Sequence, residues 1–276
     1  MEIITDISPL RTRLKCEPYV VFVPTMGSLH EGHLSLIRIA KQKAGCLVAS
    51  IFVNRLQFAQ TEEFDQYPRT LADDCKLLEN YGVDVLFVPD EKSIYPVRQE
   101  FLLKPLPVAN TLEGKFRPGY FSGVVTLVLK LFNLVHPQVA IFGKKDYQQL
   151  YIMREMVRQL NLSIEIDAGE TVRASDGLAL SSRNRYLSDE ERVEAAHLYR
   201  VLLKIKQKVE IGDRNFQELQ ENARETLVNH GWIVDYVDFR QRDTLVPVQA
   251  NDRNLIVLGA ARLGTTRLID NLEMSI

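Results

Sequence analysis

The sequence predicts an α/β fold: a Rossmann-like doubly wound parallel sheet with a smaller C-terminal α+β lid domain. Through the first two thirds of the chain, short β-rich apolar runs alternate with helical periodicity. Each run is apolar at successive positions, which is typical of strands covered on both faces. After about Val172 the pattern changes to helices followed by clustered strands. We therefore expect two domains, residues 1–175 and residues 176–276.

The strands of the parallel sheet are expected where the apolar runs are short and bounded by turn residues. These runs are 19–23, 46–53, 83–88, 139–142 and 163–166. Helical segments lie between them at 34–44, 71–81, 121–134 and 147–160. In the second of these, Leu71, Cys75 and Leu78 share one stripe. Thr70 is placed to cap this helix and Gly82 to end it.

The C-terminal part predicts two helices and then three strands. Ser188 and Glu191 fit a capping box for a helix whose apolar stripe lies within 198–205. Asn215 and Glu218 fit a capping box for a second helix, which Gly231 is placed to end. Strand-like runs follow at 233–240, 255–261 and 265–270. Because no repeat, low-complexity tract or long linker is present, we expect the two domains to be joined closely.

Composition excludes several classes of protein. The chain has 276 residues, 46% of them hydrophobic, and a net charge of -2 from 34 basic and 36 acidic residues. This balance argues against disorder and against a large nucleic-acid surface. No apolar run approaches the roughly 18 residues of a membrane helix, and the N-terminus has no signal-peptide pattern. The 3 cysteines fit neither a disulfide framework nor a zinc cluster. We expect a cytoplasmic protein with small-molecule partners and neither a nucleic-acid nor a membrane partner.

The turn after the first long strand carries the strongest chemical signal. His30, Gly32 and His33 form an HxGH pattern directly before a helix. In a doubly wound sheet such a turn lies at the ligand-binding edge, and two imidazoles at a helix N-terminus suit nucleotide phosphates. The spacing of Gly27 and Gly32 imitates a P-loop, but His33 and Leu34 stand where that motif needs Lys and Ser or Thr. The alternative is that both histidines only cap and pack a turn.

Two further loops fall at ligand-facing positions. Gly143 follows a predicted strand, so that its backbone could contact adenosine while Lys145 binds phosphate; a solvated helix start is the alternative. At the domain junction, Ser181 and Ser182 precede Arg183, whose rigid fork of donors matches phosphate oxygens. Read alone, the two serines are ordinary turn residues. Together the three loops indicate a nucleotide site.

All three motifs, in this order, resemble the pantothenate synthetase family, which is related to the HxGH nucleotidyltransferases and the class I aminoacyl-tRNA synthetases. The resemblance covers essentially the whole chain. It includes 24–33, 51–54 with Gln57 and Phe58, Tyr67 to Thr70, Tyr95 with Pro96, Phe142 with Gly143, 145–150 and 176–187.

The resemblance implies an AMP-forming acid–amine ligase (EC 6.3.2.1). ATP and (R)-pantoate give pantoyl adenylate and pyrophosphate, and β-alanine then attacks the adenylate to give pantothenate and AMP. ATP is thus a substrate and Mg²⁺ accompanies it. Relatives are dimers, so a homodimer is implied. Because the mixed anhydride hydrolyses when wet, we expect the C-terminal domain to close as a lid through the loop 181–183.

The resemblance also implies residue roles. His30, His33, Lys145 and Arg183 would be catalytic, with both histidines on phosphate oxygens and His33 as the general acid. The implied nucleotide site comprises Met26, Gly27, Ser28, Leu29, His30, Glu31, Gly32, His33, Gly143, Lys144, Lys145, Asp146, Val172, Leu180, Ser181, Ser182 and Arg183.

Two glutamines complete the implied site. Gln57 and Gln149 would hold pantoate through its hydroxyl and carboxylate, with Gln57 also near the β-alanine position. Their neutral amides orient an anion by hydrogen bonds and do not neutralise its nucleophilic oxygen. Because catalysis then consists of positioning and electrostatic stabilisation, no covalent enzyme nucleophile is needed.

The chain departs from the usual family pattern at two positions. Arg55 stands where proline usually follows Asn54, which affects the loop geometry near the first glutamine. Lys144 stands where glutamate is usual, which is expected to add positive charge beside the nucleotide. Magnesium ligands are not assigned: Asp73 and Asp74 are candidates, but a solvated first helical turn is the simpler account of both.

Two other functions stay open. An adenylyltransferase would release pyrophosphate but no β-alanine-dependent AMP, and a nucleotide sensor would bind ATP without releasing pyrophosphate. A tRNA synthetase is disfavoured because no anticodon-binding segment is left unassigned. The remaining histidines, His136, His197 and His230, have no partner motif and are expected at helix ends or on the surface.

Overall fold

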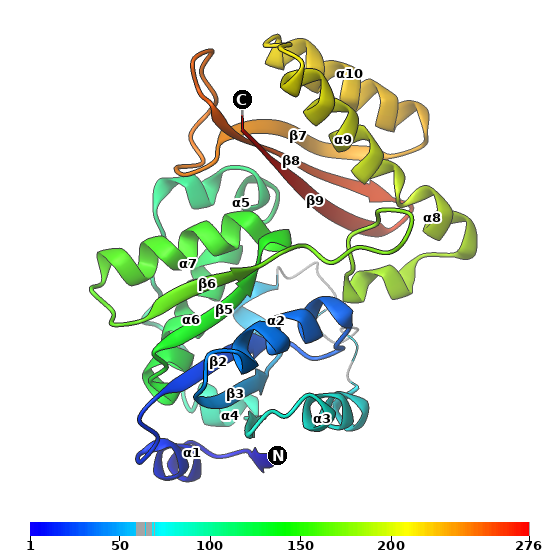
Figure 1. The fold of residues 1–276 in the computed structure, drawn as a ribbon. Helices are drawn as coiled ribbons and strands as arrows, with labels where there is room; N and C mark the ends of the chain where they lie inside the picture. Colours follow the sequence, from blue (N-terminus) through cyan, green and yellow to red (C-terminus); the bar gives the residue numbers. More distant parts are fainter. Residues whose placement is uncertain (59–63, 65–67, 69, 276) are drawn as a thin grey trace.

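The computed structural model describes residues 1–58, 64, 68 and 70–275, which form two sheets with their helices (Figure 1). The larger sheet is parallel, with the strand order β1-β4-β3-β2-β5-β6. Its strands are β1 (Glu2–Ile4), β2 (Val20–Thr25), β3 (Cys46–Ile51), β4 (Val85–Phe87), β5 (Val139–Gly143) and β6 (Glu165–Gly169). The smaller sheet is antiparallel and consists of β7 (Ile233–Gln241), β8 (Asn254–Leu263) and β9 (Thr266–Ser275). The predicted fold class is confirmed.

The central strands of the parallel sheet are buried on both faces. In β2, Val20 and Phe22 belong to one core, while Val21 and Val23 belong to the core on the opposite face. Strand side chains alternate between faces, so a strand with a core on each side is apolar at every position. This explains why the sequence shows continuous apolar runs and no alternation.

The predicted helices of the first part are confirmed as α2 (Glu31–Lys41), α3 (Leu71–Asn80), α6 (Tyr120–Val135) and α7 (Tyr147–Gln159). The structure adds β1 and three helices that periodicity did not indicate, namely α1 (Ile7–Leu14), α4 (Glu91–Ile94) and α5 (Glu113–Phe116). These elements are too short for a periodic pattern to distinguish them from a loop. Strand β6 lies two to three residues later than predicted, and its exposed edge position weakens the apolar signal.

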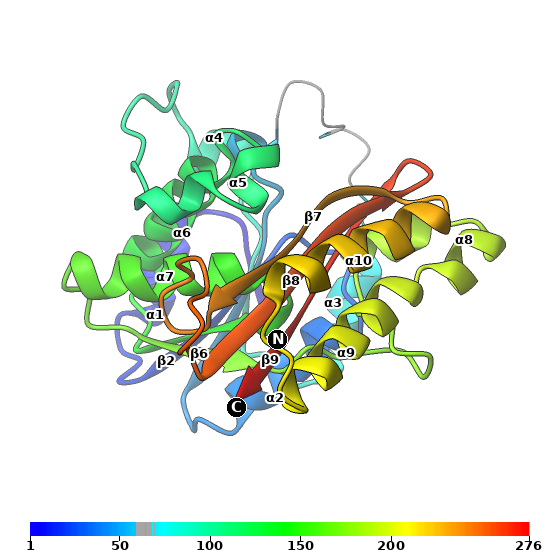
Figure 2. The same cartoon turned by 90° about the horizontal axis from the view of Figure 1, so that it is seen from above.

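In the C-terminal part the capping box is confirmed, but the helix that it begins is not the predicted one. Ser188 Oγ accepts from the Glu191 N–H at 3.2 Å and the Glu191 carboxylate accepts from the Ser188 N–H at 2.9 Å. This box starts the short α8 (Asp189–Glu194), whereas the apolar stripe belongs to α9 (His197–Glu210). The chain changes direction at Ala195 and Ala196, which are fully buried. Helix α10 (Phe216–Asn229) follows, and α9 and α10 lie along one face of the sheet (Figure 2).

The opposite face of the C-terminal sheet packs on the first part of the chain. An apolar cluster joins the two parts and consists of Leu112, Tyr147, Tyr236, Leu245, Ile256, Leu258 and Ala260. Beside it, Arg267 of β9 donates to both carboxylate oxygens of Glu113 in α5, at 2.7 and 2.8 Å. Burial alone would raise the pKa of Glu113, but the hydrogen bonds from Arg267 and Tyr236 hold it below its usual value.

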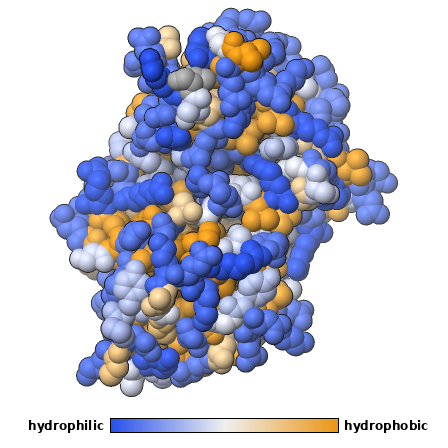
Figure 3. Space-filling view, in the orientation of Figure 1, coloured by the Kyte–Doolittle hydropathy of each residue, from blue (hydrophilic) through white to orange (hydrophobic). Residues whose placement is uncertain are grey.

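The face of the molecule seen in the orientation of Figure 1 is mostly polar (Figure 3). Hydrophilic residues cover much of the face shown in Figure 3, with apolar residues in separate groups. Within the part of the chain that the structure describes, none of the helices has both the length and the apolar character of a membrane span. The three cysteines are free thiols, of which Cys46 is buried and Cys16 is exposed.

The buried ion pair at the junction predicts a large effect of removing one partner. Arg267→Met removes the two charge-assisted hydrogen bonds from the buried Glu113 carboxylate and is expected to lower the free energy of unfolding by about 3 kcal/mol, measured by urea denaturation. The double variant Glu113→Gln/Arg267→Met is expected to recover part of this loss. A single-variant loss below about 1 kcal/mol would contradict this assignment.

Candidate active site

The candidate site lies at the carboxyl ends of the parallel strands. Strand β2 pairs with β3 on one side and with β5 on the other, and each of these three strands leads into a turn at the same edge. The turn after β2 holds the HxGH pattern; β3 leads to the short helix η1 (Arg55–Gln57) and β5 to η4 (Lys144–Asp146). Ligands bind at this kind of topological switch point in open α/β sheets.

The HxGH turn is a reciprocal helix cap. His30 Nδ1 accepts from the Gly32 N–H at 3.1 Å, and His33 Nδ1 accepts from the His30 N–H at 3.3 Å. A Cβ at Gly32 would lie 2.8 Å from His30 Cε1, so the position requires glycine. Both histidines therefore cap the turn, and the cap has a chemical consequence: with both Nδ1 atoms accepting, the proton of each neutral ring is on Nε2.

The surroundings keep both imidazoles neutral in the unliganded protein. Burial, then the charges of His33 and Lys145, lowers the pKa of His30 to about 3. Burial and then Lys145 lower the pKa of His33 to about 4. Positive charge at neutral pH therefore comes from Lys145 and Arg183, which form no ion pair with any other residue that the structure describes. Neutral N–H donors beside such cations suit a polyanion.

A buried carboxylate fixes the start of this turn. Gly27 and Ser28 have φ values of +79° and +53°, which direct the N–H groups of Ser28 and Leu29 toward Asp74 of α3. Asp74 accepts from them at 2.9 and 2.8 Å and also from Thr70 Oγ1 at 3.0 Å. Asp74 is 2% exposed, so its interpretation as part of a solvated helical turn is wrong.

Asp73, the neighbouring carboxylate, does match that interpretation. Its side chain is 78% exposed and lies 3.9 Å from Lys76. The role of Asp74 could not be found from the sequence because its partners are about 45 residues away.

Gln57 is held in place by the residues around η1. Asn54 Nδ2 donates to Gln57 Oε1 at 3.2 Å and to the Gly123 carbonyl at 3.1 Å. A Cβ at Gly123 would lie 2.2 Å from the Leu56 carbonyl oxygen, so α6 approaches η1 as closely as only glycine permits. Arg55 points outward and pairs with Glu91. The arginine that replaces the usual proline therefore leaves Gln57 among the residues lining the pocket.

Two adjacent glutamines at the start of α7 have different environments. Gln148 is buried; its amide accepts from the Glu113 N–H and donates to the carbonyls of Val108 and Thr111. Gln149 faces the pocket, where Tyr120 Oη lies 3.5 Å from its Oε1. Of the two side-chain amides, only that of Gln149 lines this pocket.

One pocket, with a volume of about 210 Å³, brings most of the expected residues together. They are Met26, His30, Gly32, His33, Gln57, Gly143, Lys145, Asp146, Gln149, Val172, Leu180, Ser181, Ser182 and Arg183. The two histidines and the two glutamines therefore share one cavity, although they come from different elements. The remaining lining is largely apolar, and α6 and β5 contribute about half of it.

Five expected nucleotide-site residues do not line this pocket: Gly27, Ser28, Leu29, Glu31 and Lys144. Glu31 pairs with Arg38 on the exposed side of α2. Ser28 and Leu29 are buried, and their N–H groups donate to Asp74. Because nucleotide contacts can also be made by backbone groups, their assignment stays a prediction.

Lys144 does not add positive charge to the pocket, so that expectation is wrong. Its Nζ lies 2.5 Å from Glu170 and 2.8 Å from Glu273 of β9. Asn271, also in β9, donates to the carbonyls of Lys144 and Lys145 at 2.9 Å. Lys144 thus connects η4 to the C-terminal sheet, through partners that no local pattern in the sequence indicates.

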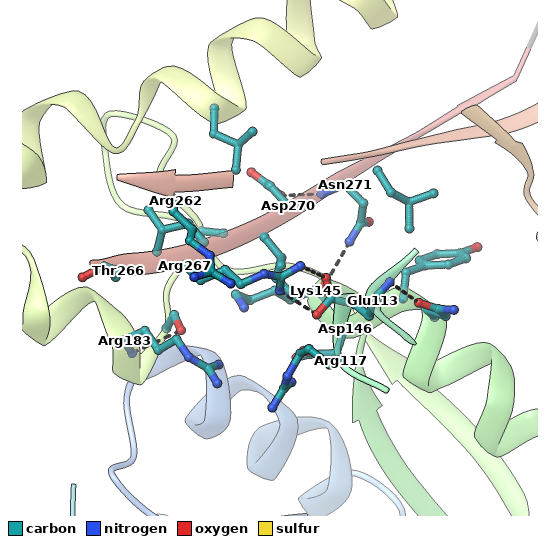
Figure 4. A pocket seen from close by; sticks show the side chains of 18 of the residues that line it. Glu113, Arg117, Lys145, Asp146, Arg183, Arg262, Thr266, Arg267, Asp270 and Asn271 are labelled. Atoms are coloured by element: carbon teal, nitrogen blue, oxygen red, sulfur yellow. Dashed lines mark hydrogen bonds and ion pairs between the residues drawn. The ribbon is translucent and has the colours of Figure 1, made fainter. Parts of the chain in front are cut away.

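A second cavity, of about 590 Å³, lies between the two sheets and adjoins the first (Figure 4). The two cavities share several lining residues, among them Lys145, Gln149, Ser181 and Arg183. The C-terminal sheet adds Arg262, Thr266, Arg267, Asp270 and Asn271 to the second cavity. The loop 181–183 therefore borders both spaces.

The remaining expectations concern residues that the structure does not describe and three further histidines. Tyr67 and Arg69, which carry part of the resemblance, lie outside the described residues. His136 caps the end of α6, His197 begins α9 and His230 follows α10, so the prediction of helix-end positions is confirmed.

The fold and the site define a Rossmann-like nucleotide-binding protein of the HxGH type, and comparison with known proteins gives the family. The Pantoate-beta-alanine ligase family model matches residues 2–273. A pantothenate synthetase from Nitrosospira multiformis is 66% identical over 275 residues, covering 100% of this chain and 99% of the relative. The chain belongs to the pantoate-beta-alanine ligase family.

Solved structures agree with this membership. The crystal structure of pantothenate synthetase from Thermus thermophilus matches with a TM-score of 0.95 and 42% identity, covering 100% of both chains. The pantoate-beta-alanine ligase from Francisella tularensis, complexed with Beta-gamma ATP and beta-alanine, matches with a TM-score of 0.82 and 35% identity. That match covers 99% of this chain and 97% of the other.

The hydrogen bonds from the turn after β2 to Asp74 predict that substitution of this residue weakens ATP binding. Asp74→Asn keeps one acceptor oxygen and loses the charge, so one of the two turn N–H groups loses its partner. We expect a roughly tenfold higher KM for ATP and a loss of about 1–2 kcal/mol of stability. Asp73→Asn is the matched control and is expected to change neither. Equal effects of the two variants in steady-state kinetics would contradict this role of Asp74.

The lowered pKa of His33 predicts a stability change with pH. An unfolded histidine titrates near 6.5, so between about pH 6.5 and 4 the unfolded state binds more protons than the folded state. The contribution of His33 is complete above pH 6.5 and is lost as the pH falls toward 4. Between pH 7 and pH 5, His33→Asn is expected to lose about 2 kcal/mol less stability than the wild type in urea unfolding. Identical losses would contradict the pKa assignment.

Proposed function

We propose that this site condenses (R)-pantoate with β-alanine in an ATP-dependent reaction through pantoyl adenylate, releasing AMP and pyrophosphate. The observation that carries the proposal is the shared pocket: the HxGH rings, two cations without ion-pair partners among the described residues and two neutral amides surround one space. The complex of the Francisella tularensis relative with Beta-gamma ATP and beta-alanine supports both substrates.

In the first step, a carboxylate oxygen of pantoate attacks the α-phosphorus of ATP. The bond from the α-phosphorus to the bridging oxygen breaks, and pyrophosphate leaves with that oxygen. Negative charge grows on the phosphoryl oxygens and on the leaving group. The Nε2–H groups of His30 and His33 and the cations Lys145 and Arg183 would stabilise this charge.

The general-acid role of His33 depends on the nucleotide. With a pKa of about 4 the ring is neutral in the unliganded protein and has no spare proton at pH 7. A bound triphosphate places several negative charges beside the ring, which raises its pKa because an opposite charge favours the imidazolium. His33 would then carry a proton to pyrophosphate only when ATP is present.

Pantoate recognition would divide between polar and apolar groups. Gln57 and Gln149 would donate to or accept from the hydroxyl and carboxylate. The two methyl groups of pantoate suit the apolar wall that Val124, Leu127 and Val128 of α6 present to the pocket. In the second step, the amine of β-alanine attacks the acyl carbon, the C–O bond to AMP breaks and the amine loses a proton.

Mg²⁺ would enter as the MgATP complex. Asp74, one of the two candidate ligands, uses its carboxylate on the Ser28 and Leu29 N–H groups, and Asp73 is exposed and outside the pocket lining. Mg²⁺ commonly keeps several waters and binds substrate phosphates with few protein ligands. When bound, it would neutralise charge on the leaving pyrophosphate.

The proposed domain division is 1–175 and 176–276, with the second domain acting as the lid. Separate apolar cores on the two sides of this boundary support the division. The loop 181–183 borders both cavities, which supports its role in closure. A homodimer and a cytoplasmic location are proposed on the likeness to the family alone.

Incubation with ATP, Mg²⁺ and pantoate, with and without β-alanine, tests the reaction. We expect about one equivalent of pyrophosphate per active site from pantoate alone and AMP turnover only with β-alanine. AMP independent of β-alanine would contradict ligation, and pyrophosphate turnover without AMP would indicate an adenylyltransferase.

Pantoate recognition is tested by a matched pair of variants on α7. Gln149→Leu removes both hydrogen-bonding groups from the pocket and is expected to lower kcat/KM for pantoate by about 100-fold. Gln159→Leu changes the exposed end of the same helix and is expected to keep kcat/KM within about twofold. Comparable values for the two variants would exclude Gln149 from pantoate binding.

A further inference from the structure

Three side chains with metal-binding groups converge in the C-terminal part, outside both cavities. Glu194 ends α8, His197 begins α9 and His230 follows α10. One ligand atom of each lies within 4.8 Å of the others, and no second group of three or more such residues is found among residues 1–58, 64, 68 and 70–275. None of the three lines the nucleotide pocket or the cavity between the sheets.

The two imidazoles lie face to face, and one buried nitrogen lacks a hydrogen-bond partner within the described part of the chain. The ring centroids of His197 and His230 are 3.9 Å apart and the ring planes differ by 22°. His230 Nδ1 lies 3.5 Å from Glu194 Oε1. The unpartnered atom is His197 Nε2, and such a condition costs roughly 1–3 kcal/mol. A bound cation would satisfy this nitrogen.

The charged groups around the cluster are of both signs. Arg200 on α9 lies close enough to His197 to repel a cation there, whereas the Glu194 carboxylate attracts one.

A buried tryptophan orients the carboxylate. Gly231 has a φ of +82°, which turns the chain so that Trp232 packs in the core with 2% exposure. The Trp232 Nε1–H donates to Glu194 Oε1 at 2.9 Å. The second carboxylate oxygen has no such partner among the described residues. Hydrogen bonds from residues that do not themselves bind the metal hold metal-ligating side chains in position.

We propose that Glu194, His197 and His230 form a binding site for a divalent transition metal of the zinc class. Two imidazoles and one carboxylate are a common zinc donor set, with water in the remaining position, and imidazole nitrogen disfavours Mg²⁺ and Ca²⁺. Stacked rings do not direct their lone pairs to one point, so binding rotates the exposed His230 ring out of the stack. The metal connects α8, α9 and α10, and the proposal is independent of the ligase reaction.

The test uses untagged full-length protein freed of metal with EDTA and then of EDTA. Co²⁺ and Zn²⁺ are added separately, with visible absorption for cobalt coordination and fluorescence of Trp232, the one tryptophan of the chain. We expect a saturable signal at one equivalent in both measurements, with Zn²⁺ displacing Co²⁺. The melting temperature is expected to rise with Zn²⁺ concentration because the metal binds the folded state. Absence of saturable binding up to about 1 mM metal would overturn the proposal.

Variants separate this site from the HxGH histidines, which also present two close rings. His197→Gln and His230→Gln are each expected to weaken cobalt binding at least about tenfold, whereas His136→Asn keeps the wild-type affinity. The exposed His230 provides the test if His197→Gln does not fold. His30→Ala/His33→Ala is expected to retain the signal. Cobalt absorption that disappears in this double variant and persists in His230→Gln would assign the metal to the nucleotide pocket and overturn the proposal.

Discussion

The site depends on one interaction, the hydrogen bonding of the buried Asp74 carboxylate to the backbone of the turn after β2. Two residues of that turn, Gly27 and Ser28, have positive φ, and the N–H groups of Ser28 and Leu29 donate to this side chain of α3. Asp74 supplies acceptors for the N–H groups of Ser28 and Leu29 and thereby sets where α2 begins. The cap formed by His30 and His33 follows from that start, and the cap in turn fixes which ring nitrogen carries the proton. The Asp74 carboxylate therefore determines which ring nitrogen carries the proton in two imidazoles that it does not contact.

The second constraint is the attachment of the C-terminal sheet to the same edge. Strand β9 binds Glu113 through Arg267, Lys144 through Glu273 and the carbonyls beside Lys145 through Asn271. Buried ion pairs of this type specify geometry more than they add stability. They position the C-terminal sheet over the second cavity, which side chains from both parts of the chain line.

The sequence predicted the features that depend on local or periodic patterns. Apolar runs indicated the buried parallel strands, and the HxGH pattern indicated the ligand edge. The position of Gln57 and Gln149 beside the histidines was implied only by the resemblance to the family. Features that depend on distant partners were missed. Asp74 looked like a solvated helical residue because its acceptor role needs the turn after β2, and Lys144 looked like a pocket cation because Glu273 lies at the far end of the chain. Strand β1 was missed because three residues give no period.

In the proposed reaction a pantoate carboxylate oxygen attacks the α-phosphorus of ATP, and an isotope measurement tests this step directly. Pantoate labelled with ¹⁸O in its carboxylate is converted with ATP and β-alanine, and the products are analysed by mass spectrometry. If the acyl adenylate forms, one labelled oxygen appears in AMP and the other remains in the amide carbonyl of pantothenate. Labelled inorganic phosphate, or AMP without label, would contradict the account.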